Sequence, residues 1–211
     1  TVHKDSVLQW LREYVRRLQE GVYVVSPIKP EFGARSNGIN LFPVSGDLWT
    51  CKVSRSVRIS SSSIYMVEAP QGWTYSIRMR LLSPGEEGYL PEEKRGFKTC
   101  QLTTRHWMIQ EGNKEPSSVR GRGVIGLYPI LCEGGWVLNK LSDPHRQYHL
   151  PAGEVRGEFV YQSCSGRFAL GKEGSFRGEM KFVPGSEANP TGPEFDVEVK
   201  RFPLALPRFT Y

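Results

Sequence analysis

The sequence predicts an all-β domain, either a sandwich or a barrel, preceded by one amphipathic helix and an extended linker. Three observations support this prediction. From Trp49 onward apolar residues recur at a period of two, as in half-buried strands. Stretches rich in Gly, Pro, Asn and Ser, which favour turns, separate these segments. After residue 48 we find no segment with the 3.6-residue period of an amphipathic helix.

Residues 1–21 predict the helix. Ser6 is the expected N-cap, with Gln9 three residues later as in a capping box, and Gly21 is the expected end. Six apolar residues fall on one face, which we expect to pack against the following domain or against a preceding region: Val7, Trp10, Leu11, Tyr14, Val15 and Leu18.

Residues 22–48 carry three prolines and several glycines, and they predict a linker ordered along a surface. Six strand segments follow, at 51–60, 73–83, 97–110, 157–165, 175–183 and 194–202. In the first, Val53, Val57 and Ile59 are candidate inward residues, with an irregularity near Arg55. In the second, the odd positions from Trp73 to Leu81 face the core, and Thr74, Ser76, Arg78 and Arg80 face the other way.

The stretch from Gly121 to Gly126, GRGVIG, fits the dinucleotide-binding pattern G-x-G-x-x-G. That pattern requires a helix directly afterwards, and Pro129 with its neighbouring paired glycines prevents one. We therefore exclude a nicotinamide enzyme. Two interpretations remain. The loop either binds a small anion through Arg120, Gly121, Arg122, Gly123 and Gly126, or uses its glycines only to turn the chain, which we favour.

Five segments together resemble the ApaG domain in order and spacing: CQLTTRHWMIQEGN, VRGRGVIGLYPIL, GEFVYQSCSGRFA, GSFRGEMKFV and FDVEVKRFPLALP. The resemblance implies an immunoglobulin- or fibronectin-III-like β-sandwich of about seven strands over residues 49–211. It also marks residues 135–156 as an insertion, because family members pass almost directly from the glycine loop to the next strand.

Within that family the chain looks most similar to plant F-box proteins, in which a cell-wall-assembly-regulator-like region precedes the ApaG domain. The resemblance implies a non-catalytic module that binds the protein substrate of an SCF-type ubiquitin ligase. The F-box that contacts the SCF adaptor subunit would lie outside this fragment. Because the chain opens without Met or an apolar signal region, we expect a piece of a longer protein.

Composition argues against nucleic acid and membranes as partners. The net charge of +6 is spread along the chain, so we expect no nucleic-acid binding, and no apolar run is long enough to span a membrane. The cysteines (Cys51, Cys100, Cys132 and Cys164) form no C-x-x-C pair, which predicts reduced thiols in the cytoplasm or nucleus.

We also expect no enzyme, cofactor or bound metal. Trp107 is predicted to be core, and its neighbour His106 points the other way without a partner nearby in sequence. Four carboxylates are expected to be solvated: Glu179, Glu194, Asp196 and Glu198. No serine lies in the G-x-S-x-G motif of a nucleophile elbow. His145 and His149 have the spacing of metal ligands, but they lie on a proline-containing loop and not on a helix. The alternatives kept open are a pyrophosphate or nucleotide site at the glycine loop and a divalent-metal-handling protein.

Overall fold

The computed structural model describes residues 5–28, 36–66, 72–138, 155–164, 168 and 172–206. Within these ranges the elements are α1 (Ser6–Gln19), β1 (Val24–Ile28), β2 (Ser36–Asn40), β3 (Trp49–Ser54), β4 (Val57–Tyr65), β5 (Trp73–Leu81), α2 (Glu92–Arg95), β6 (Cys100–Glu111), β7 (Ser117–Arg122), β8 (Pro129–Cys132), β9 (Gly135–Leu138), β10 (Val155–Arg156), β11 (Phe159–Cys164), β12 (Gly174–Pro184) and β13 (Phe195–Leu204).

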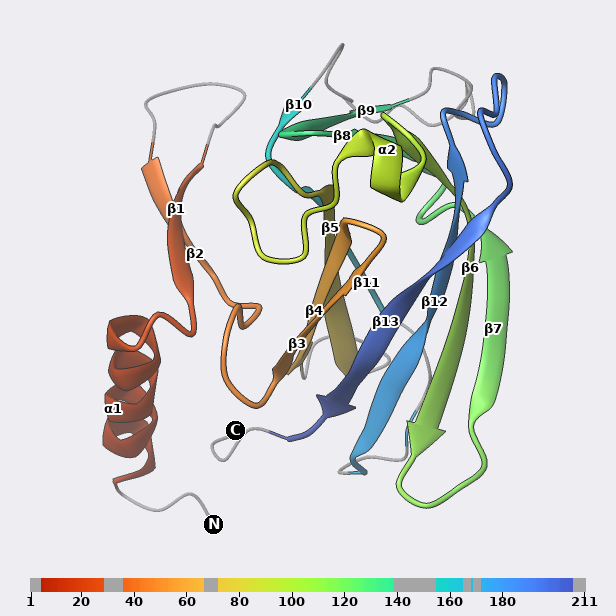
Figure 1. Cartoon of the computed structure of the whole chain (residues 1–211). Coiled ribbons are helices and arrows are strands. Elements are labelled where there is room, and N and C mark those ends of the chain that lie inside the picture. Colours follow the sequence, from red (N-terminus) through yellow and green to blue (C-terminus); the bar gives the residue numbers. More distant parts are fainter. Residues whose placement is uncertain are drawn as a thin grey trace.

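Two antiparallel sheets pack face to face, which confirms the predicted all-β sandwich (Figure 1). One sheet has the order β11-β5-β4-β3. The other has the order β10-β9-β8-β6-β12-β13, and β7 pairs with β6 beside β8. Near the edge of the sandwich the Ser63 hydroxyl donates to the Pro203 carbonyl at 2.7 Å, which joins β4 to β13.

The sandwich has more strands than the seven that the family resemblance implies, because the chain turns more often than expected. The segment predicted as one strand at 51–60 is a hairpin, with Arg55 and Ser56 at φ of 47° and 65°. Val57 and Ile59 are buried as expected, but Val53 pairs with Arg58 on the outer face and lies outside the core. The short helix α2 has no counterpart in the prediction.

Aromatic side chains fill the middle of the sandwich. The ring of Phe176 lies 4.7 Å from that of Tyr75, 5.2 Å from that of Trp107 and 5.0 Å from that of Phe202. Trp107 is 1% exposed, which confirms it as a core residue. These rings come from both sheets, so their contacts hold the sheets together.

Gly178 allows β12 to approach β6 closely at Trp107. A Cβ atom at this position would lie 2.1 Å from the backbone oxygen of His106 and 2.5 Å from a ring carbon of Trp107. No side chain fits in that space, so the glycine is required by packing and not by its backbone angle.

Both faces of the central strands β4 and β5 are largely covered, although the sequence predicted a polar outer face on β5. Ser76 is fully buried there and Arg78 is 5% exposed. Residues 40–44, which we call the strap, cross this face, and the Arg78 guanidinium donates to the carbonyls of Phe42 and Pro43 at 3.4 and 3.5 Å. Burial lowers the pKa of Arg78. The predicted linker therefore forms a hairpin (β1–β2) and a cover for the sheet.

The helix α1 stands beside the sandwich (Figure 1). Asp5, and not Ser6, occupies the N-cap position, without a side-chain cap hydrogen bond. Gly21 ends the helix at φ 69°, where the Val22 amide donates to the Arg17 carbonyl at 2.9 Å, as in a Schellman motif. None of the helix residues is buried, although the ring of Tyr14 lies 5.9 Å from that of Tyr23, so most of the apolar stripe stays exposed within the described chain.

The C-terminal segment and the predicted insertion both lie partly outside the described residues. Phe202 and Leu204 are buried in β13 and Leu206 packs against the core, whereas Phe209 lies beyond the described chain. Strands β9 and β10 belong to the two ends of the predicted insertion at 135–156, and residues 139–154 between them are not described.

Replacing Gly178 by Ala should lower the free energy of unfolding by about 2 kcal/mol or more, because the added methyl group overpacks the β6–β12 contact. Chemical denaturation measures the change. Gly192→Ala is the matched control, since its Cβ would meet only the Pro184 ring, with Cγ at 3.4 Å and Cβ at 3.6 Å, which are ordinary contact distances. Equal stability of the two variants would contradict the packing argument.

Candidate functional site

The glycine loop turns the chain sharply after β7. Gly123 and Gly126 have φ of 53° and 80°, and a Cβ on Gly123 would lie 2.5 Å from the Leu127 carbonyl oxygen. Three amides already donate within the protein: Gly123 to the Thr103 carbonyl, Val124 to that of Leu127, and Leu127 to that of Val124. The glycines thus have a conformational role, and these three amides point at protein carbonyls.

The arginines beside this loop differ in their partners. Arg122 forms an ion pair with Glu187, and its guanidinium lies 5.8 Å from the centre of the Tyr128 ring. Arg105 donates to the Gly123 carbonyl at 2.6 Å. Arg120 is exposed and has no partner among the described residues. Of these three, Arg120 is the arginine available to a ligand.

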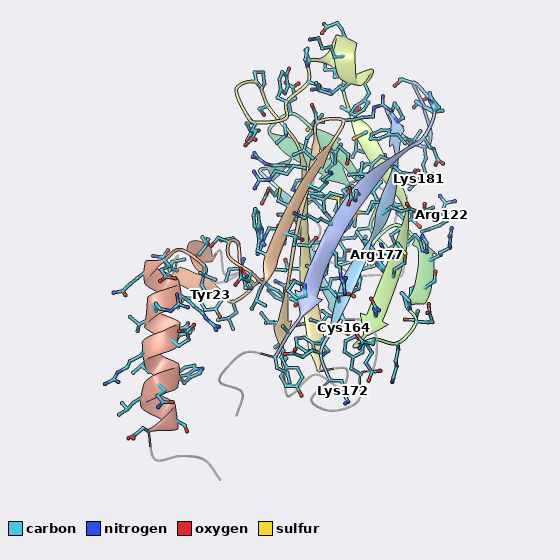
Figure 2. The ribbon with its side chains drawn as sticks, turned by 60° about the horizontal axis from the view of Figure 1, so that its bottom comes forward. Tyr23, Arg122, Cys164, Lys172, Arg177 and Lys181 are labelled. Atoms are coloured by element: carbon cyan, nitrogen blue, oxygen red, sulfur yellow. The ribbon has the colours of Figure 1, made fainter. Side chains whose placement is uncertain are left out.

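A first hollow, of about 350 Å³, lies on the outer face of the seven-stranded sheet. Three of the five residues of the predicted anion site, Arg120, Gly121 and Arg122, line one part of it, and Arg105 joins them. Gly123 and Gly126 are not among the residues that line this hollow. Figure 2 shows Arg122 and Lys181, which also lines the hollow, close together on this side of the molecule.

The carboxylates on this face are paired, contrary to the expectation that they would only be solvated. Glu179 Oε1 lies 3.1 Å from Nδ1 of His106, and Asp196 Oδ1 lies 2.7 Å from Nζ of Lys181. On the other side of His106, Nε2 lies 2.8 Å from the Ser118 hydroxyl oxygen. His106 therefore has two partners, Glu179 and Ser118, 73 and 12 residues away in sequence.

A second hollow is larger, about 590 Å³, and more apolar. We call it the groove; it lies between the end of β2 with the strap and the outer face of β4, β5 and β11. Its lining includes Ile39 and Leu41, whose exposed fractions are 40% and 46%. The sequence predicted a linker ordered along a surface but did not indicate which surface, so it did not predict the groove.

The groove borders an open strand edge. Among the described strands β11 pairs with β5 only, so the backbone groups along its other edge have no strand partner there. Gln162, Ser163 and Cys164 of β11 line the groove. An open edge beside an apolar hollow is the arrangement that accepts an extended peptide as an added strand.

All four cysteines are free thiols, as expected. Burial raises the pKa of Cys51 and, strongly, that of the fully buried Cys100. Cys164 is exposed, at the groove. Among the described residues no group of three His, Cys, Asp or Glu side chains could hold a metal ion; His145 and His149 lie outside them.

Neither described helix is both long enough and apolar enough to cross a membrane.

The fold is an antiparallel β-sandwich. A protein-family model described as the ApaG domain matches residues 67–163. A bacterial relative, Protein ApaG of Pseudomonas paraeruginosa, is 30% identical over 115 residues that cover 54% of this chain and 68% of that protein. The chain belongs to the ApaG domain family.

Two eukaryotic relatives are F-box proteins. F-box protein SKIP16 of Arabidopsis thaliana is 35% identical over 216 residues, which cover 99% of this chain and 42% of that protein. F-box only protein 3 of Homo sapiens is 27% identical over 125 residues, which cover 59% of this chain and 24% of that protein. The chain thus spans well under half the length of the F-box relatives that it matches.

The Gly123→Val variant should lose about 2 kcal/mol or more of unfolding free energy, because a β-branched side chain resists positive φ and its Cβ meets a carbonyl. Thermal denaturation tests this. Gly134→Val serves as control, because Gly134 also has a positive φ, of 79°, but a Cβ added there would have no atom within 4 Å. The prediction fails if Gly134→Val is the more destabilised of the two.

Cysteine reactivity should follow exposure. Ellman's reagent should modify Cys164 first in the native protein and reach Cys100 only after unfolding, because burial disfavours the Cys100 thiolate. Mass spectrometry of the modified peptides identifies the sites, and Cys164→Ser removes the fast phase in the control. Rapid modification of native Cys100 would show that the sandwich opens readily.

Proposed function

We propose that this chain is a non-catalytic protein-recognition module, the substrate-binding part of an F-box protein in an SCF-type ubiquitin ligase. The observation that carries the proposal is the 35% identity to a plant F-box protein across 99% of this chain. Transfer of ubiquitin would belong to the other ligase subunits. The F-box that binds the SCF adaptor would lie outside these residues, and the protein would act in the cytoplasm or nucleus. We keep residues 49–211 as the proposed extent of the ApaG domain.

We place the substrate contact at the groove. The occupant that fits it is an extended peptide that pairs with the free edge of β11 and sets apolar side chains against Ile39 and Leu41. Backbone hydrogen bonds to a strand edge carry little sequence information, so the apolar wall would supply the selectivity.

A second candidate function is small-anion binding at the glycine loop. It is favoured by the hollow beside the loop, where Arg120 is exposed and pairs with none of the other described residues. Calorimetric titration of pyrophosphate and nucleotides into the native chain and an Arg120→Gln variant tests it. Tight binding that Arg120→Gln abolishes would support the anion site.

The ligase assignment is tested on the full-length protein. Affinity purification with and without residues 1–211 should recover the SCF adaptor subunit in both cases, and candidate substrates only when these residues are present. The substrates should also become less ubiquitylated when this region is deleted. If the adaptor never accompanies the full-length protein, the ligase assignment fails.

Substitution within the groove should remove substrate binding. Leu41→Glu in the full-length protein should lower recovery of those substrates about tenfold or more, because a carboxylate would be buried at an apolar contact. Val119→Glu is the matched control, since Val119 is 38% exposed on the other sheet. Quantitative mass spectrometry compares them, and equal losses in both variants would exclude the groove.

A further inference from the structure

Three side chains with complementary chemistry line up across three strands on the outer face of the seven-stranded sheet. Glu179 of β12 stands directly opposite His106 of β6 in the strand register. Ser118 of β7 pairs with Met108 and therefore lies diagonally beside His106. The two contacts are short: 3.1 Å from Glu179 Oε1 to His106 Nδ1, and 2.8 Å from His106 Nε2 to Ser118 Oγ.

The chemistry of the groups fixes the direction of these hydrogen bonds. An ionised carboxylate only accepts, so Nδ1 of His106 must carry the proton that it donates to Glu179. In a neutral imidazole Nε2 then has a lone pair, and it accepts the hydroxyl proton of Ser118. A carboxylate, an imidazole and a hydroxyl in this order form the arrangement that makes a serine nucleophilic.

The cluster is accessible from solvent, and it borders space for a small molecule. The His106 side chain is only 16% exposed, so the strands on either side hold it, whereas Glu179 is 48% exposed. His106 and Glu179 line the hollow of about 350 Å³, and Ser118 is exposed beside them. A hollow of this size has room for a small ligand next to His106.

One cation is free to stabilise negative charge next to the hydroxyl. Arg120 lies two residues after Ser118 in β7, so both side chains fall on the same face. Arg120 also pairs with His106 in the register and lines the hollow. Arg122 and Lys181 each form an ion pair with a carboxylate, whereas Arg120 has no partner within the described part of the chain.

We propose that Ser118 is a nucleophile that His106 activates and Glu179 positions, and that it reacts with small carboxylic esters. The Ser118 oxygen bonds to the ester carbonyl carbon while Nε2 of His106 takes the hydroxyl proton. The carbon–oxygen bond to the alcohol then breaks, and the leaving alcohol takes that proton from Nε2. A water molecule then attacks the acyl carbon while Nε2 of His106 takes one of its protons. The bond from that carbon to the Ser118 oxygen breaks, and Ser118 takes the proton back from Nε2. Arg120 faces the developing oxyanion.

The ester chemistry is a second activity beside the proposed recognition role, which itself involves no catalysis, because its residues lie on the opposite sheet from the groove. No sequence motif surrounds Ser118. Both partners of His106 are remote from it in the chain, at 12 and 73 residues.

Covalent labelling tests the proposal on the whole chain. A fluorophosphonate probe should label Ser118, located by mass spectrometry of the digested protein. Labelling should be lost in Ser118→Ala and fall about a hundredfold in rate in His106→Gln, because the general base is removed. Ser117→Ala is the matched control, since its hydroxyl donates to the Ile109 carbonyl and contacts no described histidine. The absence of labelling in the native chain, or labelling that persists in Ser118→Ala, overturns the proposal.

Ester turnover supplies the second measurement. The native chain should hydrolyse p-nitrophenyl acetate with a burst that acylates Ser118, and Arg120→Gln should slow the burst about tenfold. A rate that Ser118→Ala leaves unchanged would mean that His106 or another side chain reacts directly with this ester, and it would overturn the role of Ser118.

The positioning role of Glu179 has a spectroscopic readout. Nitrogen-15 NMR should show the Nδ1–H tautomer of His106 in the native chain and a larger share of the Nε2–H tautomer in Glu179→Gln. Labelling of Ser118 should slow at least tenfold in that variant. An unchanged tautomer together with unchanged labelling would remove Glu179 from the proposal.

Discussion

The antiparallel pairing of β6 with β12 is the constraint on which most of the molecule depends. Because side chains alternate along a strand, this one register places Trp107 against Phe176 in the core and His106 against Glu179 outside. Gly178 makes the pairing possible, since any side chain there would meet the His106 backbone. A slip of one residue would expose the core tryptophan and separate the outer pair in the same step.

The two outer faces of the sandwich differ in what lies on them. The strap lies across the four-stranded sheet and buries Arg78, which leaves the groove beside the open edge of β11. The seven-stranded sheet carries instead a network of charged and hydroxyl side chains around His106. One domain thus offers an apolar surface suited to a peptide and a polar hollow suited to a small molecule.

The glycine loop is a motif of the family resemblance, and in the structure it is a turn. Its positive φ angles and its internally directed amides fit a turn that leads the chain from β7 toward β8, and a Cβ on Gly123 would strike the Leu127 carbonyl. Its neighbour Arg120 contributes to the hollow of the outer face. The most recognisable motif of the sequence is therefore explained by conformation, and the chemically interesting group is the arginine next to it.

The sequence by itself determined the alternation of the strands, the burial of Trp107, the end of α1 at Gly21 and the family, since each depends on residues close together in the chain. It did not determine the hairpin at Arg55, the cover over Arg78, or the meeting of Ser118, His106 and Glu179. The periodicity of a segment predicts which face of the sheet a side chain takes, but it does not predict which strand pairs with that segment. Strand pairing depends on interactions summed along whole strands, and so only the tertiary structure decided it.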